Sequence, residues 1–173
     1  MKFDPQKHHR RSIRLKGYDY SQTGVYYVTI VTQGRECIFG EIVNKEMILS
    51  RYGEFVQTWW DDIPIHFPNV EILAFVIMPN HIHGIIFITD NGKGEVISPV
   101  HSKPTLGQVI AYFKYQSTKE MNALDNKGVI KKFWQRNYYE HIIRNEKELK
   151  QKTDYILDNP SKWDNDAENL MNK

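Results

Sequence analysis

The chain has 173 residues, 40% of them hydrophobic, which is the size of one ordinary globular domain that can bury a core without covalent cross-links. Lys and Arg number 23 against 21 Asp and Glu, so the net charge of +2 does not by itself indicate a polyanionic partner. A single cysteine, Cys37, excludes a disulfide framework and a cysteine-based zinc site, and it fits a reducing cytoplasm.

Positive charge is concentrated at the start of the chain. Residues 1–18, here named the basic arm, hold one acid, Asp4, against Lys2, Lys7, Arg10, Arg11, Arg14 and Lys16. Such a run is either a solvated tail or a contact for nucleic acid phosphates. The arm lacks the apolar segment of a signal peptide, and no apolar run reaches membrane-spanning length, so we expect a cytoplasmic protein with no membrane partner.

The first half of the chain predicts four strands or strand pairs and one helix. "GVYYVTIVTQ", from Gly24, is rich in β-branched and aromatic residues and predicts a strand. "CIFGEIVNKEMILS" predicts a hairpin around its polar centre. Ser50 precedes "RYGEFVQTWWDDI", whose apolar spacing predicts a helix ending near Pro64. "NVEILAFVIM" and "HIHGIIFI" flank a "PN" turn and predict adjacent antiparallel strands. Because both are continuously apolar, we expect both to be central in the sheet and covered on both faces.

The second half predicts a loop, two helices and one more strand. Residues 89–104 are rich in Gly, Pro and Ser and predict a surface loop. Thr105 with Gln108, and Asn145 with Glu148, form capping boxes that predict two helix starts, and Pro160 ends the second helix. "NYYEHII" predicts a strand between them. This order predicts an α+β, ferredoxin-like sandwich with a central antiparallel sheet and an extra C-terminal helix, in one domain over residues 1–173.

Two histidines stand one residue apart in the apolar run "FVIMPNHIHGIIFI". Because side chains alternate along a strand, His81 and His83 share one face and Ile82 takes the other. Two imidazoles placed this way can converge on one metal ion, but ordinary hydrogen bonds would also satisfy them. A third ligand and a reactive group nearby would favour the metal.

The last predicted helix supplies both. In "TDYILDNPSKW", Tyr155 and Asn159 are four residues apart and therefore share a helix face, on the flank of the apolar stripe. The Asn159 amide oxygen could join two imidazoles on a metal, and Tyr155 would then lie one helical turn from the ion. A phenol is a poor nucleophile when neutral, so a metal that draws charge onto a phosphodiester would help it attack.

With these residues the sequence resembles a known family, the single-tyrosine HUH transposases, which are named for a triad of histidine, hydrophobic residue and histidine. The closest likeness is to the REP-associated tyrosine transposases. The likeness covers most of residues 10–163 and is carried by four blocks in the family's order: "RRSIRLKGYDYSQTGVYYVTI", "FVIMPNHIHGII", "FWQRNYYEHIIRNEKEL" and "YILDNP". Four ordered blocks are much more specific than one triad.

The resemblance implies a ferredoxin-like HUH endonuclease fold and a strand transferase that acts on single-stranded, hairpin-bearing DNA. It implies that Tyr155 is the nucleophile, forming a 5′-phosphotyrosine, and that His81, His83 and Asn159 hold Mg²⁺ or Mn²⁺. The family commonly has glutamine at the third ligand position, so Asn159 keeps the amide on a shorter arm. Some relatives form homodimers that exchange a C-terminal helix.

Charge and resemblance together suggest where DNA binds. The expected contacts are Arg10, Arg11, Arg14, Lys16, Lys114, Trp134, Arg136 and Lys152. Trp134 is included as an exposed aromatic that could stack on an unpaired base beside basic residues, and Lys152 as a group that could steady a phosphate near Tyr155.

Other interpretations of these residues remain open. Tyr138 and Tyr139 are rival nucleophiles, which we expect to pack in a strand or touch DNA, and we expect His141 to be structural or to contact phosphate. Trp59 and Trp60 are expected to pack in or at the edge of the core. A non-catalytic module that binds single-stranded nucleic acid would not need Tyr155 or a metal, and a zinc hydrolase would need a third strong ligand.

Overall fold

The computed structural model describes residues 17, 19–20, 22–90, 103–125 and 128–169. The predicted DNA contacts Arg10, Arg11, Arg14 and Lys16 lie outside these residues, as does most of the predicted loop at 89–104. Within the described part of the chain, no helix is both long and apolar enough to cross a membrane.

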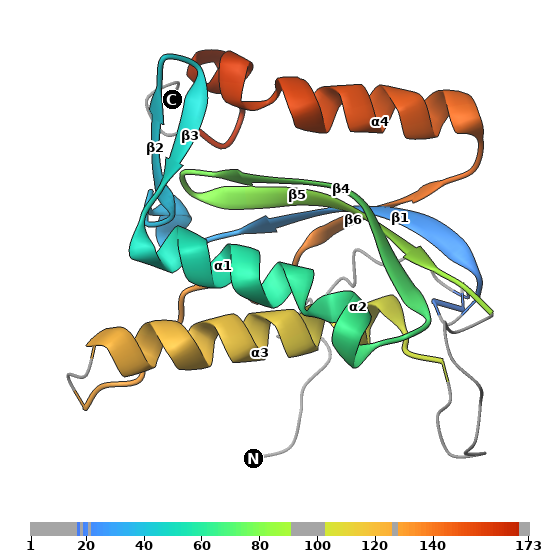
Figure 1. The fold of residues 1–173 in the computed structure, drawn as a ribbon, viewed down its shortest axis with the longest axis horizontal. Coiled ribbons are helices and arrows are strands. Elements are labelled where there is room, and N and C mark those ends of the chain that lie inside the picture. Colours follow the sequence, from blue (N-terminus) through green and yellow to red (C-terminus); the bar gives the residue numbers. More distant parts are fainter. Residues whose placement is uncertain (1–16, 18, 21, 91–102, 126–127, 170–173) are drawn as a thin grey trace, which may run out of the picture.

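Three layers make up the molecule (Figure 1). The middle layer is an antiparallel sheet of β1 (Gly24–Val31), β4 (Val70–Met78), β5 (His81–Ile88) and β6 (Tyr139–Ile143), in the order β4-β5-β1-β6. On one face lie α1 (Arg51–Asp61), α2 (Ile63–His66) and α3 (Leu106–Asp125), and α4 (Glu146–Asp158) covers the other. The order of elements and strands confirms the predicted ferredoxin-like α+β sandwich with an added C-terminal helix.

Smaller elements occupy one end of the sheet. β2 (Gly40–Val43) and β3 (Glu46–Leu49) form the predicted hairpin, whose turn residues Asn44 and Lys45 have φ of 52° and 69°. Positive φ at both central residues is the type I′ geometry that matches the twist of two paired strands. Short 3₁₀ turns follow β1 (Gln33–Arg35) and α4 (Pro160–Asn165).

The helix starts are explained by their caps. The Ser50 side chain accepts from Gly53 N–H at the start of α1. Before α3, the Thr105 N–H donates to Gln108 Oε1 at 2.7 Å, and the Gln108 N–H donates to Thr105 Oγ1 at 3.2 Å. Asn145 accepts from Glu148 N–H at 2.9 Å, while the Glu148 carboxylate reaches back to Arg144 N–H rather than to Asn145.

The predicted helix end near Pro64 is confirmed, because α1 ends at Asp61. Pro64 itself lies in the first turn of the short α2, where a missing N–H leaves no bond unmade. The predicted central position is wrong for one of the two apolar strands. β4 is an edge strand, not a central one, and Leu73 is 41% exposed at its bulge. The predicted cover on both faces is confirmed, because α1 and α2 contact β4 from one side of the sheet and α4 from the other, and this cover explains its apolar run.

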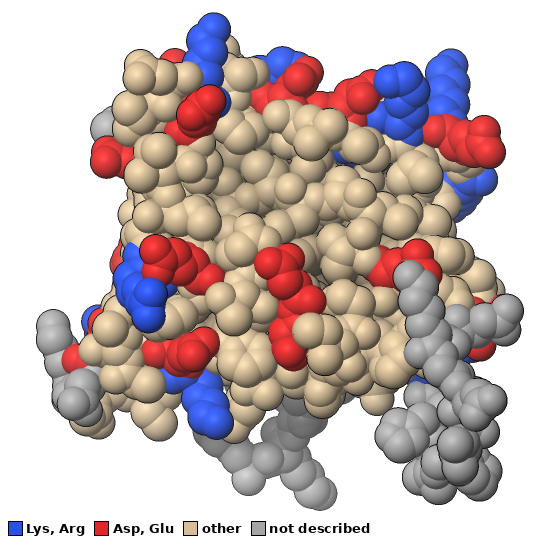
Figure 2. All heavy atoms as spheres, in the orientation of Figure 1, with Lys and Arg blue, Asp and Glu red and all other residues tan. Residues whose placement is uncertain are grey.

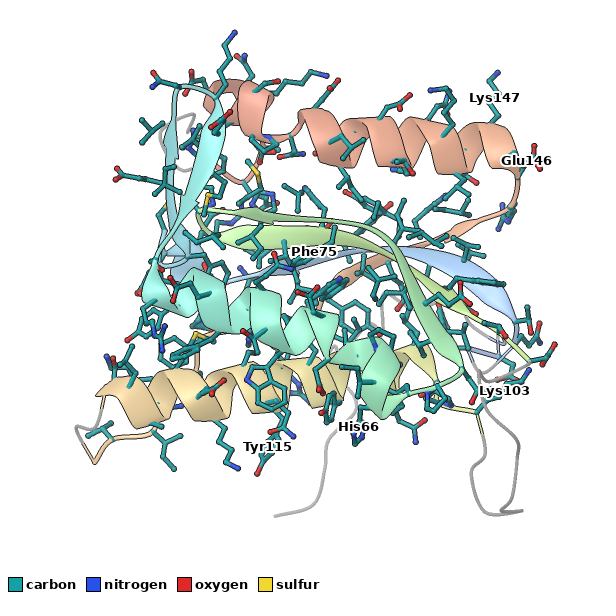
Figure 3. All side chains as sticks on the ribbon, viewed as in Figure 1. His66, Phe75, Lys103, Tyr115, Glu146 and Lys147 are labelled. Atoms are coloured by element: carbon teal, nitrogen blue, oxygen red, sulfur yellow. The ribbon has the colours of Figure 1, made fainter. Side chains whose placement is uncertain are left out.

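Alternation along the strands divides the core in two. Ile82 and Ile86 of β5 pack toward α1 and α3 with Trp60 and Phe113, whereas Ile85 packs with Ile156 beneath α4. The predicted packing role of the tryptophans holds, since Trp60 is fully buried and stacks on Phe75, which Figure 3 shows between α1 and the sheet. His81 and His83 are therefore on the α4 face, opposite the larger core.

Gly84, between His83 and Ile85, is required by this packing, because a Cβ there would lie 2.2 Å from Trp60 Cζ2. We predict that Gly84→Ala lowers the free energy of unfolding by about 1–3 kcal/mol, measured by urea denaturation, because the overpacked indole must move. Trp60→Phe opens that space, so the double variant should be more stable than the sum of the two single changes indicates. If the losses in free energy of unfolding of the two single variants simply add up in the double variant, the Trp60 indole is not what excludes a Cβ at position 84.

Candidate functional site

The rings of the two β5 histidines lie side by side on the α4 face of the sheet, with centroids 4.6 Å apart and an interplanar angle of 69°. Both are buried, at 0% and 4% exposure, and their Nε2 atoms lie 3.0 Å apart. Two imidazole nitrogens on one divalent ion at about 2.1 Å, at right angles, are about 3.0 Å apart. The spacing therefore fits a shared cation as well as it fits a direct hydrogen bond.

His81 is oriented by the residue before it. Asn80 is fully buried, and its side-chain N–H groups donate to the carbonyls of Arg35 (3.1 Å) and Glu168 (2.8 Å). These bonds leave the Asn80 Oδ1 to accept from His81 Nδ1 at 2.8 Å. His81 consequently carries its proton on Nδ1, and its Nε2 has a lone pair directed into the site.

His83 is held by two hydroxyls of β1. Its Nδ1 lies 2.7 Å from the Tyr27 hydroxyl and 2.8 Å from Thr29 Oγ1, the residue that pairs with His83 across the sheet. A hydroxyl can donate or accept, so His83 can carry its proton on either nitrogen. With the proton on Nδ1, His83 also presents a lone pair toward His81.

Burial keeps both imidazoles neutral. It lowers the pKa of His81 well below its usual value, with the charge of His83 adding to the effect, and lowers the pKa of His83 to about 3, with Lys152 contributing. Neutral imidazole is the form that binds metal.

Tyr155 projects from α4 toward this pair. Its ring centroid is 5.3 Å from that of His83 and 6.4 Å from that of Tyr27, and its side chain is 42% exposed. Burial raises the pKa of the Tyr155 phenol, and a hydrogen bond from the Asn159 side chain opposes that rise. The structure thus places the predicted nucleophile beside the predicted ligands and open to solvent.

Asn159 is the C-cap of α4 and is almost fully buried. Its Oδ1 is one of the few buried side-chain atoms that find no hydrogen-bond partner among the described residues. A buried amide oxygen without a partner costs about 1–3 kcal/mol, and a cation or a bound ligand group would relieve that cost.

Asp166 was not among the residues predicted from the sequence. It follows the 3₁₀ turn after α4, and one of its carboxylate oxygens lies within 4.8 Å of the ligand nitrogens of His81 and His83. Burial raises the Asp166 pKa, while a hydrogen bond from Glu168 N–H opposes the rise. No spacing rule links Asp166 to the histidines, because only the fold of the C-terminal segment brings them together.

A pocket of about 540 Å³ opens above these groups. Its wall includes Tyr155, His83, Asp166, Lys152 and Tyr139. The Lys152 ammonium lies 4.5 Å from the centre of the Tyr27 ring, and this predicted phosphate contact lines the same pocket as Tyr155. Tyr139, treated as a rival nucleophile, is 53% exposed and also borders the pocket.

The other predicted DNA contacts lie away from this pocket. Trp134 is only 6% exposed, packs on Phe39 and Phe113, and donates to Ser117 Oγ at 3.0 Å. The expectation that it is an exposed stacking platform is therefore wrong, because its ring fills the core beneath α3. Lys114 and Arg136 border a separate groove, described below.

The remaining expectations concern residues near the site. His141 is 2.5 Å from the Glu148 carboxylate through Nε2, which joins β6 to the first turn of α4 and agrees with a structural role. Trp59 is partly buried and donates to Glu120, at the edge of the core.

Comparison with known proteins places this fold and site in a group. A Haemophilus influenzae protein without an assigned function is 43% identical over 175 residues, covering 95% of this chain and 96% of its own. A second protein of that organism, named for the REP-associated tyrosine transposases, is 30% identical over 144 residues, covering 83% of this chain and 74% of its own. No protein-family profile matches the chain.

A solved structure agrees at the level of the fold. It is a REP-associated tyrosine transposase bound to a REP hairpin, with a TM-score of 0.59 and 21% identity, covering 87% of this chain and 74% of its own. The chain therefore has the fold of a tyrosine transposase. Within that class, this chain belongs to the family of REP-associated tyrosine transposases.

The buried histidines predict how stability depends on pH. Both folded pKa values lie below the unfolded value near 6.5, so unfolding takes up protons below that pH. The stability contributed by the neutral pair is fully present above pH 6.5 and is lost as pH falls toward the folded pKa values, by about 1.4 kcal/mol per pH unit for each histidine. Urea unfolding of the metal-free protein between pH 7 and pH 5 measures this slope.

A variant that removes one titrating group checks the assignment. His83→Gln should reduce the slope by about half, because it removes one of the two buried imidazoles. A slope that is the same in wild type and His83→Gln would contradict a buried neutral His83.

Proposed function

We propose that this protein is a transposase that cleaves and rejoins single-stranded, hairpin-bearing DNA through a covalent 5′-phosphotyrosine at Tyr155, with Mg²⁺ or Mn²⁺ at the histidine pair. The observation that carries the proposal is the placement of the Tyr155 ring 5.3 Å from that of His83, whose Nε2 lies 3.0 Å from that of a second buried, neutral imidazole. The REP hairpin held by the structural neighbour supports a hairpin as the DNA partner.

The donor set fits a hard or borderline divalent ion. His81 and His83 offer two lone pairs, and oxygen donors are available from Asn159 and Asp166. Imidazoles favour Mn²⁺ and its neighbours, and amide and carboxylate oxygens suit Mg²⁺ as well. When bound, such an ion withdraws charge from the oxygens of a phosphodiester and makes the phosphorus more electrophilic.

In the proposed cleavage, the Tyr155 phenol loses its proton to solvent and its oxygen bonds to the phosphorus. The bond from phosphorus to the 3′ oxygen breaks, and that oxygen takes up a proton as a free 3′ hydroxyl. The product, a 5′-phosphotyrosine ester, retains the phosphoester bond, so the reverse attack by a 3′ hydroxyl rejoins a strand without an external energy source. Hydrolysis would lose this property.

The residues around Tyr155 have distinct parts in this reaction. The Asn159 side chain donates to the phenol and offsets part of the pKa rise caused by burial, which favours the phenolate. The Lys152 ammonium borders the same pocket, where a scissile phosphate would need a positive charge. We assign the basic arm, with Arg10, Arg11, Arg14 and Lys16, to the phosphates of the DNA beside the hairpin.

Cleavage should leave protein attached to DNA. When labelled hairpin DNA is incubated with the protein and Mn²⁺, we predict a denaturation-resistant adduct on a gel. The adduct should disappear with EDTA and in Tyr155→Phe, because that variant lacks the attacking oxygen, and should remain in Tyr139→Phe, a matched loss of one hydroxyl in the same pocket. An adduct that survives in Tyr155→Phe and is lost in Tyr139→Phe would identify the other phenol as the nucleophile.

Metal affinity without DNA tests the ligand set independently of cleavage. We predict that His83→Ala weakens Mn²⁺ binding at least tenfold, measured by electron paramagnetic resonance of free Mn²⁺, because one of two nitrogen donors is lost. Asn159→Ala and Asp166→Ala show which oxygen completes the site. The variant that removes a ligand oxygen should weaken Mn²⁺ binding, and the other variant should not. Equal Mn²⁺ affinity in wild type and His83→Ala would contradict a metal centre at this position.

A further inference from the structure

A second hollow lies on the opposite layer of the molecule, between α3 and the segment that leads into β6. This groove has a volume of about 560 Å³ and is lined by Lys114, Tyr115, Thr118, Lys119, Asn122 and residues 130–136. Ligand-binding hollows usually fall in the range of about 300–1,000 Å³. The histidine pair and Tyr155 are not part of it.

The outer wall of the groove is fixed by two side chains of α3. The Lys114 ammonium donates to the carbonyls of Gln135 (2.9 Å) and Asn137 (3.2 Å). Asn122 forms a two-way clamp on Lys131, donating to its carbonyl at 3.1 Å and accepting from its N–H at 2.8 Å. The segment therefore keeps its shape without a ligand.

Positive charge dominates the rim. Lys119, Lys132 and Arg136 are exposed and have no ion pair among the described residues. Lys114 is bound by carbonyls and not by a carboxylate, and burial lowers its pKa to about 8. Only Lys131 is neutralised there, by Asp125. By contrast, on the face seen in Figure 2, Lys and Arg lie toward the margins, and the middle holds uncharged and acidic side chains.

The floor and edges of the groove are apolar. Phe133 and Trp134 form part of the floor, while Tyr115 and Ile130 are 66% and 87% exposed at its edges. Figure 3 shows Tyr115 projecting from α3 away from the sheet. A basic rim with an exposed aromatic is the combination that binds phosphates and unstacked bases of a single strand.

The groove is also adjacent, along the chain, to the catalytic pocket. Arg136 lines the groove, and Tyr139, three residues later, lines the pocket that holds Tyr155. Three extended residues span at most about 10 Å. Between the two hollows the chain runs through residues 137–138 to the start of β6, which is an edge strand of the sheet, so an unpaired strand can pass from one hollow to the other around this edge.

We propose that this groove is a second DNA site, which holds the single-stranded segment next to the hairpin as it leaves the Tyr155 pocket. The inference rests on the proposed function and extends it by a surface and by the part of the substrate that the surface binds. Lys119, Lys132 and Arg136 contact the phosphates, and Tyr115 contacts a base. The groove sets affinity for the unpaired tail, not for the duplex stem.

The test measures binding alone, in the Tyr155→Phe background, so that a failure of cleavage does not affect it. Fluorescence anisotropy compares a bare hairpin with the same hairpin carrying an unpaired tail of about eight nucleotides, at either end. The variant Lys119→Glu/Lys132→Glu/Arg136→Glu should lose at least tenfold in affinity for a tailed hairpin and should leave the bare hairpin unchanged. The slope of log affinity against log salt concentration should be shallower by about 2 in this variant, because three contacts to single-strand phosphates are lost.

A matched control carries the same change in net charge elsewhere. Lys45→Glu/Arg51→Glu/Lys147→Glu alters three exposed positions outside the groove and should bind both hairpins as the parent does. Tyr115→Ala, which changes no charge, should weaken binding of the tailed hairpin several-fold and gives a second readout if the triple variant folds poorly.

Three results would overturn the proposal. Equal losses on bare and tailed hairpins would assign the groove to the duplex stem. Unchanged affinity in both groove variants would leave it without a DNA role. If the parent chain binds neither hairpin, the proposed function fails together with the groove.

Discussion

The structure depends on burying two imidazoles side by side on an internal strand without leaving their nitrogens unsatisfied. Placing two polar rings in a core is unfavourable unless each nitrogen has a partner. Asn80 provides one for His81, and Tyr27 with Thr29 provides one for His83. All three partners orient the rings so that the remaining nitrogens face each other. The same network that makes burial tolerable therefore holds the two Nε2 atoms at the spacing that a shared cation would need.

The antiparallel pairing of β5 with β1 is what supplies these partners. Thr29 lies directly opposite His83, and Tyr27 lies opposite Ile85 on the same face of the sheet. α4 then crosses that face, buries Ile156 against Tyr27 and Ile85, and leaves Tyr155 on its flank, at the rim of the pocket. Packing of one isoleucine thus sets the position of the phenol. The Asn159 C-cap and the turn that follows bring two oxygen donors to the same place.

Sequence patterns were sufficient for the local elements and for placing Tyr155 beside the two histidines. Helix caps, the β-hairpin turn and strand alternation are rules of short range, and they predicted the fold, the shared face of His81 and His83, and the flank position of Tyr155. Asp166 could not be predicted, because its approach to the histidines depends on the path of the chain after α4. Trp134 was misjudged for the related reason that basic neighbours in sequence do not reveal which side of a segment faces the core. β4 was expected to be central because its sequence is continuously apolar. An edge strand covered by helices on both faces has the same apolar sequence as a central strand.

The central claim is that Tyr155 is the group that becomes joined to DNA. The most direct test is to find which tryptic peptide of the covalent adduct carries a nucleotide. Trypsin separates residues 153–162, in which Tyr155 is the sole tyrosine, from residues 137–144, which contain Tyr138 and Tyr139. Mass spectrometry of the nuclease-trimmed adduct should find the nucleotide on 153–162. A nucleotide on 137–144 would contradict the account.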